Sequence, residues 1–271
     1  MTRPLIDLTF EPSFRGGSGP PLVLIHGGTA TWHVWKSGLP ALVGNHDVLA
    51  PTLPGHHGGP PFDRPVDIGV FADCVEQAMD RAGFERAHLA GNSLGGWTAL
   101  ELARRGRARS VVALSPAGGW PPGDRRVRRI FLDTDRRLRA SRALLPILMR
   151  FAAVRRLGFR LVAEHGERLT TAEALTVIEG ALRADLQGGQ SIFDHVCEEI
   201  ADPGVPVLLA WGERDRLFPS PRYTDAWRRA VPYGEWRTLP GVGHLPMIDD
   251  PELVAVTIRD WAAHADRTAA P

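Results

Sequence analysis

A serine in a glycine-rich turn is the sequence feature with the clearest chemical meaning. Residues 91–96 read GNSLGG and directly follow a short apolar run. The pattern G-x-S-x-G between a strand and a helix predicts a sharp turn that raises the Ser93 hydroxyl above the edge of a sheet. Gly91 and Gly95 fit this turn because larger side chains would collide there, and a helix starting at Leu94 would point its N–H groups at the same place. The alternative is an ordinary helix-capping serine.

A serine hydroxyl needs a general base near neutral pH, and the chain offers one at a suitable place. His244 lies in the segment GVGHLP, between an expected edge strand and the last helix. Asp215 follows another apolar run, where a carboxylate can fix the tautomer of a histidine and stabilise its cation. Taken alone, His244 could be a capping or loop histidine and Asp215 a turn-forming aspartate. The order Ser93, Asp215, His244, however, is that of a known fold that carries this triad. We therefore predict these three as the catalytic residues.

A glycine turn after an early apolar run predicts an oxyanion hole. Residues 26–28 read HGG, and such a tight turn lets backbone N–H groups face the serine. We expect the N–H groups of Gly28 and Leu94 to hold the oxyanion, with His26 bracing the loop rather than acting as the base. A simple turn is the alternative for the two glycines.

Three further residues near this turn are candidates for a substrate pocket. Thr29 and Trp32 follow the HGG turn, and Trp120 stands where the helical middle of the chain begins. An apolar pocket is one role for the tryptophans, and packing in the core is an equally good alternative.

These residues need a scaffold, which the alternation of apolar runs and helical patterns predicts. Apolar runs between turn residues indicate parallel strands joined by helical crossovers, and their continuity indicates a sheet covered on both faces. The expected fold class is thus α/β, with a mostly parallel central sheet and helices on both faces. Strands are expected at 22–25, 47–50, 87–90, 111–114, 205–211 and 236–239, and helices at 66–82, 94–105 and 252–265.

The alternating pattern stops in the middle of the chain. Residues 118–202 contain no convincing strand and are crowded with arginine. We predict a helical cap, or lid, inserted into a core formed by residues 1–117 and 203–271. Since the chain has 31 arginines and one lysine, these arginines favour a solvated helical face over a site for acidic or phosphorylated substrates.

Composition excludes several classes of protein. The chain has 271 residues, 44% of them apolar, and a formal net charge of +1, which fits one large α/β domain and does not favour nucleic-acid binding. Two cysteines make no disulfide framework, and neither a secretion signal nor a run of ~18 apolar residues is found. We therefore expect a cytoplasmic protein with a small-molecule substrate and no membrane span. Its oligomeric state is not indicated.

Taken together, the motifs resemble those of the α/β-hydrolase superfamily, in particular its single-domain serine hydrolases with a helical cap. Residues 53–56 also look like the D-L-P-G-H-G segment of that group, with Thr52 where aspartate is usual and His57 where glycine is usual. The resemblance covers both core segments and says little about the cap. The oxyanion loop, nucleophile elbow, acid turn and histidine turn are matched by residues 26–28, 91–96, 212–215 and 243–244.

The resemblance implies acyl transfer without a metal or an organic cofactor, on an ester-like bond of a small or medium apolar acyl substrate. Ser93 argues against haloalkane dehalogenases and epoxide hydrolases, which carry aspartate at the elbow, and against dienelactone hydrolases, which carry cysteine. A carbon–carbon bond hydrolase or a cofactor-free perhydrolase on the same triad is an alternative. A non-catalytic ligand-binding receptor or scaffold is another, which the complete triad argues against.

Overall fold

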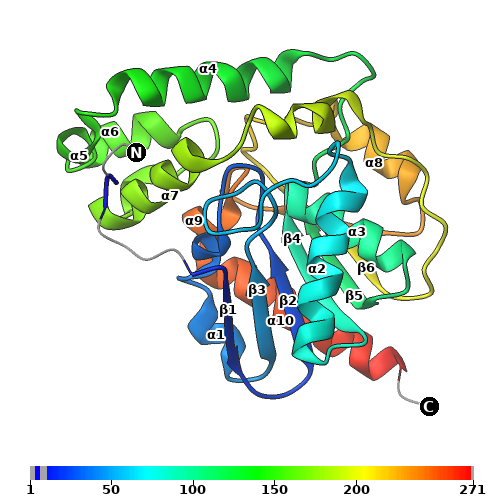
Figure 1. Cartoon of the computed structure of the whole chain (residues 1–271). Helices are drawn as coiled ribbons and strands as arrows, with labels where there is room; N and C mark the ends of the chain where they lie inside the picture. The colour runs from blue at the N-terminus through cyan, green and yellow to red at the C-terminus, as the bar shows by residue number, and fades with distance from the viewer. Residues whose placement is uncertain (1–3, 7–10, 270–271) are drawn as a thin grey trace.

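The central element of the fold is a twisted seven-stranded sheet, seen in a computed structural model that describes residues 4–6 and 11–269 (Figure 1). Its strand order is β1-β3-β2-β4-β5-β6-β7, with β1 antiparallel to β3 and every other pair parallel. The predicted fold class is confirmed. The strands are β1 Ser13–Gly17, β2 Pro21–Ile25, β3 Asp47–Pro51, β4 Ala87–Asn92, β5 Ala108–Leu114, β6 Val207–Gly212 and β7 Glu235–Leu239.

The continuous apolar runs arise because side chains of one strand enter two separate cores. In β2, Val23 and Ile25 belong to the apolar cluster on one face of the sheet, whereas Leu22 and Leu24 belong to the cluster on the other. Successive side chains of a strand point to opposite faces, so a strand buried on both sides must be apolar throughout. All four of these side chains are completely buried.

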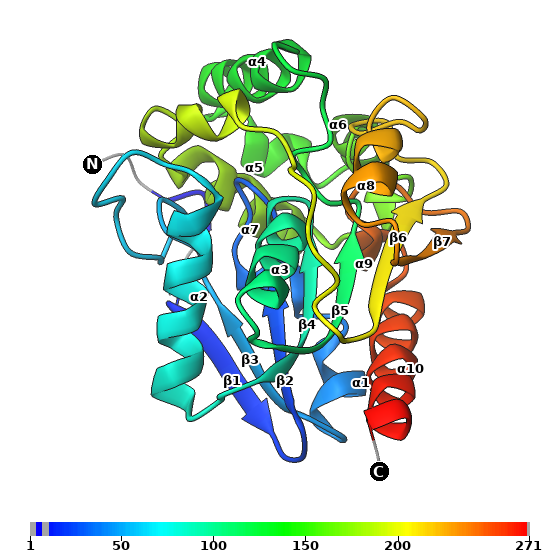
Figure 2. The same cartoon turned by 90° about the vertical axis from the view of Figure 1, so that its right-hand side faces the viewer.

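Helices cover both faces of the sheet, as Figure 2 shows. On one face lie α2 (Ile68–Ala82), α3 (Leu94–Arg104) and α8 (Thr224–Ala230); on the other lie α1 (Leu39–Val43), α10 (Pro251–Ala269) and the 3-10 turn η1 (Trp32–Trp35). The ends of α2 follow from local chemistry. The Asp67 side chain accepts the Val70 N–H at its start, and Gly83, at φ 78°, ends it in the left-handed conformation that glycine adopts without strain.

Every strand expected from the sequence is present, and the structure adds one at the edge. Strand β1 has the sequence SFRGG, whose apolar content is too low to predict a strand. Its pairing with β3 supplies the backbone hydrogen bonds that hold it extended. Pairing with a distant segment, rather than local propensity, therefore forms this strand.

Only helices lie between β5 and β6, a stretch that the structure describes in full. They are α4 (Arg126–Ser141), α5 (Leu145–Leu148), α6 (Ala152–Phe159), α7 (Thr171–Arg183) and the 3-10 turns η2 (Gly166–Arg168) and η3 (Gly188–Asp194). In Figure 1 they lie above the sheet, at the end where the loop after β4 emerges. They have an apolar cluster of their own, including Leu145, Phe159 and Leu175. We use the word cap only as a name for residues 118–202; that they act as a lid stays a prediction.

Candidate active site

The Ser93 turn is strained and depends on two glycines. Between β4 and α3, Ser93 has φ 54° and ψ −116°, a conformation that non-glycine residues rarely adopt. Its N–H donates to the Leu114 carbonyl at 2.9 Å. A Cβ on Gly91 would lie 2.0 Å from the Gly95 oxygen, and a Cβ on Gly95 would lie 2.1 Å from the Ile25 oxygen. The serine is thus raised by backbone-to-backbone packing that side chains would prevent.

The HGG loop lies directly against this turn. A Cβ on Gly27 would come within 3.1 Å of the Ser93 Cβ. His26 Nδ1 donates to the Gly27 carbonyl at 2.8 Å, and its Nε2 accepts the Leu53 N–H at 2.9 Å. Burial, assisted by His56, lowers the pKa of His26 well below its ordinary 6.5. His26 is therefore a neutral brace of the loop, as its sequence position indicates.

His244 and Asp215 form a buried pair. His244 Nδ1 and Asp215 Oδ2 are 2.8 Å apart, and both side chains are almost fully buried. The other carboxylate oxygen accepts the N–H groups of Leu217, at 2.9 Å, and Phe218, at 2.7 Å. Burial alone would raise the pKa of Asp215. His244 and the Phe218 N–H lower this pKa by more than burial raises it, so the net shift is downward. The carboxylate stays ionised and holds the imidazole in one orientation.

The histidine turn is held in place by contacts that the sequence does not reveal. Asn92, one residue before the serine, donates its side-chain N–H to the His244 carbonyl at 2.8 Å. A Cβ on Gly212 would lie 2.2 Å from the Gly243 oxygen, so the acid and histidine turns touch through their backbones. The loops after β4, β6 and β7 are thereby joined. The one sequence signal for the Asn92 contact was a polar residue at the end of an apolar strand, which does not name its partner.

A second carboxylate ties the histidine turn to the cap. Asp249 is almost completely buried. Its Oδ2 accepts the N–H of Gly243 at 2.7 Å and that of Glu164 at 3.0 Å, and its Oδ1 accepts the His165 N–H at 2.7 Å. Two of these N–H groups belong to residues 164–165 and the third to the histidine turn. This side chain therefore fixes the cap helices relative to the loop that carries His244.

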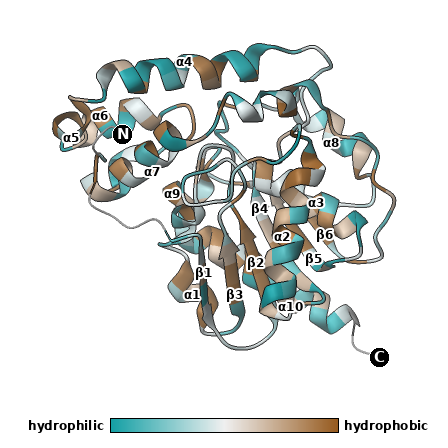
Figure 3. Ribbon diagram, in the orientation of Figure 1, coloured by the Kyte–Doolittle hydropathy of each residue, from teal (hydrophilic) through white to brown (hydrophobic). Residues whose placement is uncertain are grey.

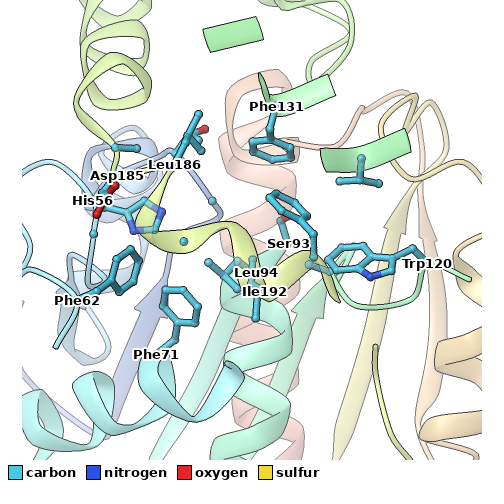
Figure 4. Close-up of a pocket in the computed structure, with 18 of the residues that line it drawn as sticks. His56, Phe62, Phe71, Ser93, Leu94, Trp120, Phe131, Asp185, Leu186 and Ile192 are labelled. Atoms are coloured by element: carbon cyan, nitrogen blue, oxygen red, sulfur yellow. The ribbon is translucent and has the colours of Figure 1, made fainter. Parts of the chain in front are cut away.

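Two cavities border Ser93. The smaller one has a volume of about 60 Å³ and is lined in part by η3, with Leu94 and Trp120 also in its wall (Figure 4). Figure 4 shows Ser93 between Trp120 on one side and His56 on the other, with Phe131 of the cap above. Its wall is mostly apolar and includes the aromatic side chains Phe62, Phe71, Phe131, Phe193 and Phe218.

The larger cavity, of about 280 Å³, lies between the core and the cap. It is bordered by Ser93 and His244 from the core and by Leu145 and Phe159 from the cap. Most of its other lining side chains are also apolar. Gly28, Thr29, Ser93, Phe131 and Leu186 border both cavities, so the two spaces meet above the serine.

The structure places most of the predicted site residues together. Gly28, Thr29 and Ser93 border both cavities, Leu94 and Trp120 the smaller one and His244 the larger one. Asp215 lies behind His244 as its hydrogen-bond partner. The assignments of catalytic and oxyanion-binding roles to these residues stay predictions.

Trp32 corrects the predicted pocket. It borders neither cavity that contains Ser93. Its Nε1 donates to the Glu11 carbonyl at 3.0 Å, and its ring stacks on His33, with 4.0 Å between ring centroids, and packs on Phe14 of β1. As the first residue of η1, Trp32 turns toward the edge strand, which the sequence did not predict.

Comparison with known proteins gives the family. A sequence description of the alpha/beta hydrolase family matches residues 22–257, which include the serine, acid and histidine turns. The chain belongs to this family.

Two curated relatives and one solved structure show what the chain is similar to. It is 32% identical over 211 residues to the epoxide hydrolase EphH of Mycobacterium tuberculosis, covering 72% of this chain and 96% of that protein. It is 29% identical over 252 residues to a pimeloyl-[acyl-carrier protein] methyl ester esterase of Neisseria meningitidis, covering 88% and 91%. The crystal structure of carboxylesterase CesB from Bacillus subtilis matches with a TM-score of 0.70 and 21% identity, covering 93% of this chain and 87% of that one, which shows the fold alone.

The packing at Gly95 makes a prediction about stability. Gly95→Ala places a Cβ against the Ile25 and His26 carbonyls, which the sheet and the loop hold fixed. We expect the free energy of unfolding to fall by about 3 kcal/mol or more, measured by chemical denaturation. The control is Gly44→Ala, at a helix end with open space around the new methyl group. A loss below about 1 kcal/mol at Gly95 would contradict this account.

Acid stability tests the buried state of His56. Burial lowers the pKa of His56 from 6.5 to about 4, so the unfolded chain binds this proton at higher pH than the folded chain does. Stability is therefore lost as the pH falls from 6.5 toward 4, by about 3 kcal/mol from this residue. His56→Asn can still donate to the Pro54 carbonyl. This variant should make the unfolding free energy depend less steeply on pH between pH 7 and 4.5. An unchanged slope, equal to that of the exposed control His264→Asn, would refute the assignment.

Proposed function

We propose that the chain is a serine hydrolase that cleaves an ester-like bond. Ser93 is the nucleophile, His244 the general base and Asp215 the residue that orients the imidazole. The observation that carries the proposal is the buried 2.8 Å hydrogen bond between His244 and Asp215, behind a cavity that the strained Ser93 also borders. A neutral imidazole whose Nδ1–H is held by a carboxylate leaves its Nε2 to accept a proton.

The proposed reaction has two balanced halves. His244 takes the hydroxyl proton as Ser93 Oγ bonds to the carbonyl carbon, and the N–H groups of Gly28 and Leu94 stabilise the oxyanion. The alkoxide leaves with the proton from His244, which yields an alcohol and an acyl-enzyme. Water then attacks the acyl group while giving a proton to His244, and Ser93 recovers that proton as the carboxylic acid departs.

The two cavities support an apolar substrate and an assignment of its two parts. The leaving group must lie beside His244, which protonates it, and His244 borders the larger cavity. The acyl group then occupies the smaller cavity, whose wall contains Leu94 and several aromatic rings. We therefore propose short to medium acyl groups joined to a larger apolar leaving group.

The relatives support hydrolysis more broadly than they support one substrate. The esterase relative cleaves a methyl ester, as its name says, which supports ester hydrolysis but not the larger leaving group proposed from the cavities. We do not extend the reaction of the epoxide hydrolase relative to this chain, because Ser93 stands where epoxide hydrolases carry an aspartate. Carbon–carbon cleavage and perhydrolysis use the same triad and remain the alternatives within the family.

Removal of the nucleophile or the base should abolish turnover without unfolding the protein. We expect Ser93→Ala and His244→Ala each to lower kcat for an activated p-nitrophenyl ester by ~10³ or more, because the residues act as a unit. The control is Ser18→Ala, an exposed serine in the turn between β1 and β2. A fluorophosphonate probe should label wild type and the control but not Ser93→Ala, with thermal unfolding confirming that each variant is folded.

Other outcomes redirect the proposal. A folded wild type that no fluorophosphonate labels favours the receptor or scaffold alternative. Near-full activity in Asp215→Asn would move the acid role to Glu213, which accepts the Gly241 N–H at 2.8 Å. Turnover of vinylogous diketones, or of hydrogen peroxide with a carboxylic acid, in preference to esters would favour the carbon–carbon or perhydrolase alternative.

A further inference from the structure

One end of the cap exposes large apolar side chains to water, which an ordinary solvent-facing surface does not account for. We call residues 144–160, which contain α5 and α6, the cap tip. Within the described residues, every large apolar side chain that is exposed lies here, and the colours of Figure 3 show α5 as apolar at the end of the cap. The side chains and their exposed fractions are Leu144 57%, Ile147 58%, Phe151 59% and Leu157 66%.

The opposite side of the same two helices is also apolar. Leu145, Met149 and Phe159 are buried in the apolar cluster of the cap. A surface helix normally buries one apolar stripe and presents polar residues to water. Apolar side chains on both sides indicate that the outer side is also covered in use.

The cap tip contains arginines but no acidic residue of its own. Residues 144–160 include four arginines and neither aspartate, glutamate nor lysine. Arg150, Arg156 and Arg160 are exposed, and in the described part of the chain no carboxylate lies within ion-pair distance of Arg150 or Arg160. Arginine stems lie along apolar surfaces while the guanidinium groups reach phosphate, so this surface matches an anionic lipid headgroup layer.

The tip also forms part of the wall of the larger cavity. Leu145, Met149, Gly158 and Phe159 line the space that Ser93 borders. A surface that contacts the tip therefore lies close to the wall of the proposed leaving-group cavity. An apolar substrate released from that surface would reach the serine after a short path along apolar side chains.

We infer that the cap tip is a docking surface for anionic phospholipid membranes, with Ile147 and Phe151 inserting and Arg150 and Arg160 contacting phosphates. A second copy of this chain fits less well, because a symmetric contact would bring the same arginines together without a carboxylate. An acidic protein would pair with the arginines but leave the inserted side chains unexplained. Delivery of a lipid-borne substrate rests on the proposed function; the docking itself does not.

The experiment measures vesicle binding separately from catalysis. Ser93→Ala protein is centrifuged with vesicles of phosphatidylcholine alone or of phosphatidylcholine with phosphatidylglycerol, at low and high salt. We expect binding to the anionic vesicles only, falling with salt. Arg150→Gln with Arg160→Gln should weaken it by about fivefold per arginine, and Ile147→Ser with Phe151→Ser by at least as much.

Matched controls separate docking from general charge. Arg81→Gln with Arg267→Gln removes the same charge at exposed positions of α2 and α10, at the far end of the molecule from the cap, and should leave binding intact (Figure 1). Equal losses in this control, or no binding by folded Ser93→Ala protein, overturn the inference. A third result would also overturn it: polyglutamate displaces the protein from the vesicles, and Ile147→Ser with Phe151→Ser leaves vesicle binding unchanged. That result would indicate an acidic protein partner. A dimer that these substitutions dissociate in sedimentation would identify a second copy instead.

Discussion

The site depends on loops that meet through their backbones. A Cβ on Gly95 would lie 2.1 Å from the Ile25 carbonyl oxygen at the end of β2, and one on Gly212 would lie 2.2 Å from the Gly243 oxygen of the histidine turn. Within the serine turn itself, a Cβ on Gly91 would lie 2.0 Å from the Gly95 oxygen. Their missing side chains let the turns after β2, β4, β6 and β7 approach closely. The strain at Ser93 persists because this packing surrounds it. Without this close approach, the loop that carries the Ser93 hydroxyl and the loop that carries His244 would lie apart.

The parts of this arrangement that follow local chemistry could be predicted from the sequence. The turn at Ser93 needs small residues two positions before and after it, and the continuous apolar run of β2 needs two cores. Both are visible as residue types at fixed spacing. The pairing of Asp215 with His244 was predictable from chain order, because consecutive strand ends in a parallel sheet open at one edge.

The parts that depend on contacts between distant segments could not be predicted. Strand β1 exists through its pairing with β3, and that strand also draws Trp32 away from the predicted pocket. The hydrogen bond from Asn92 to the His244 carbonyl joins residues 152 positions apart. Asp249 similarly joins the histidine turn to the cap. No spacing pattern encodes such contacts, because each depends on how several elements pack.

The arginines of the chain divide into two groups once their neighbours are known. Directly after α3, Arg105 pairs with Asp73, Glu76 and Glu101, and on α4, Arg139 pairs with Asp135. A solvated face bearing its own carboxylates accounts for these. At the cap tip carboxylates are absent from the sequence while apolar side chains are exposed. Solvation explains isolated arginines but gives no reason to keep Phe151 and Leu157 in water, whereas contact with an apolar layer bearing negative charge accounts for both features.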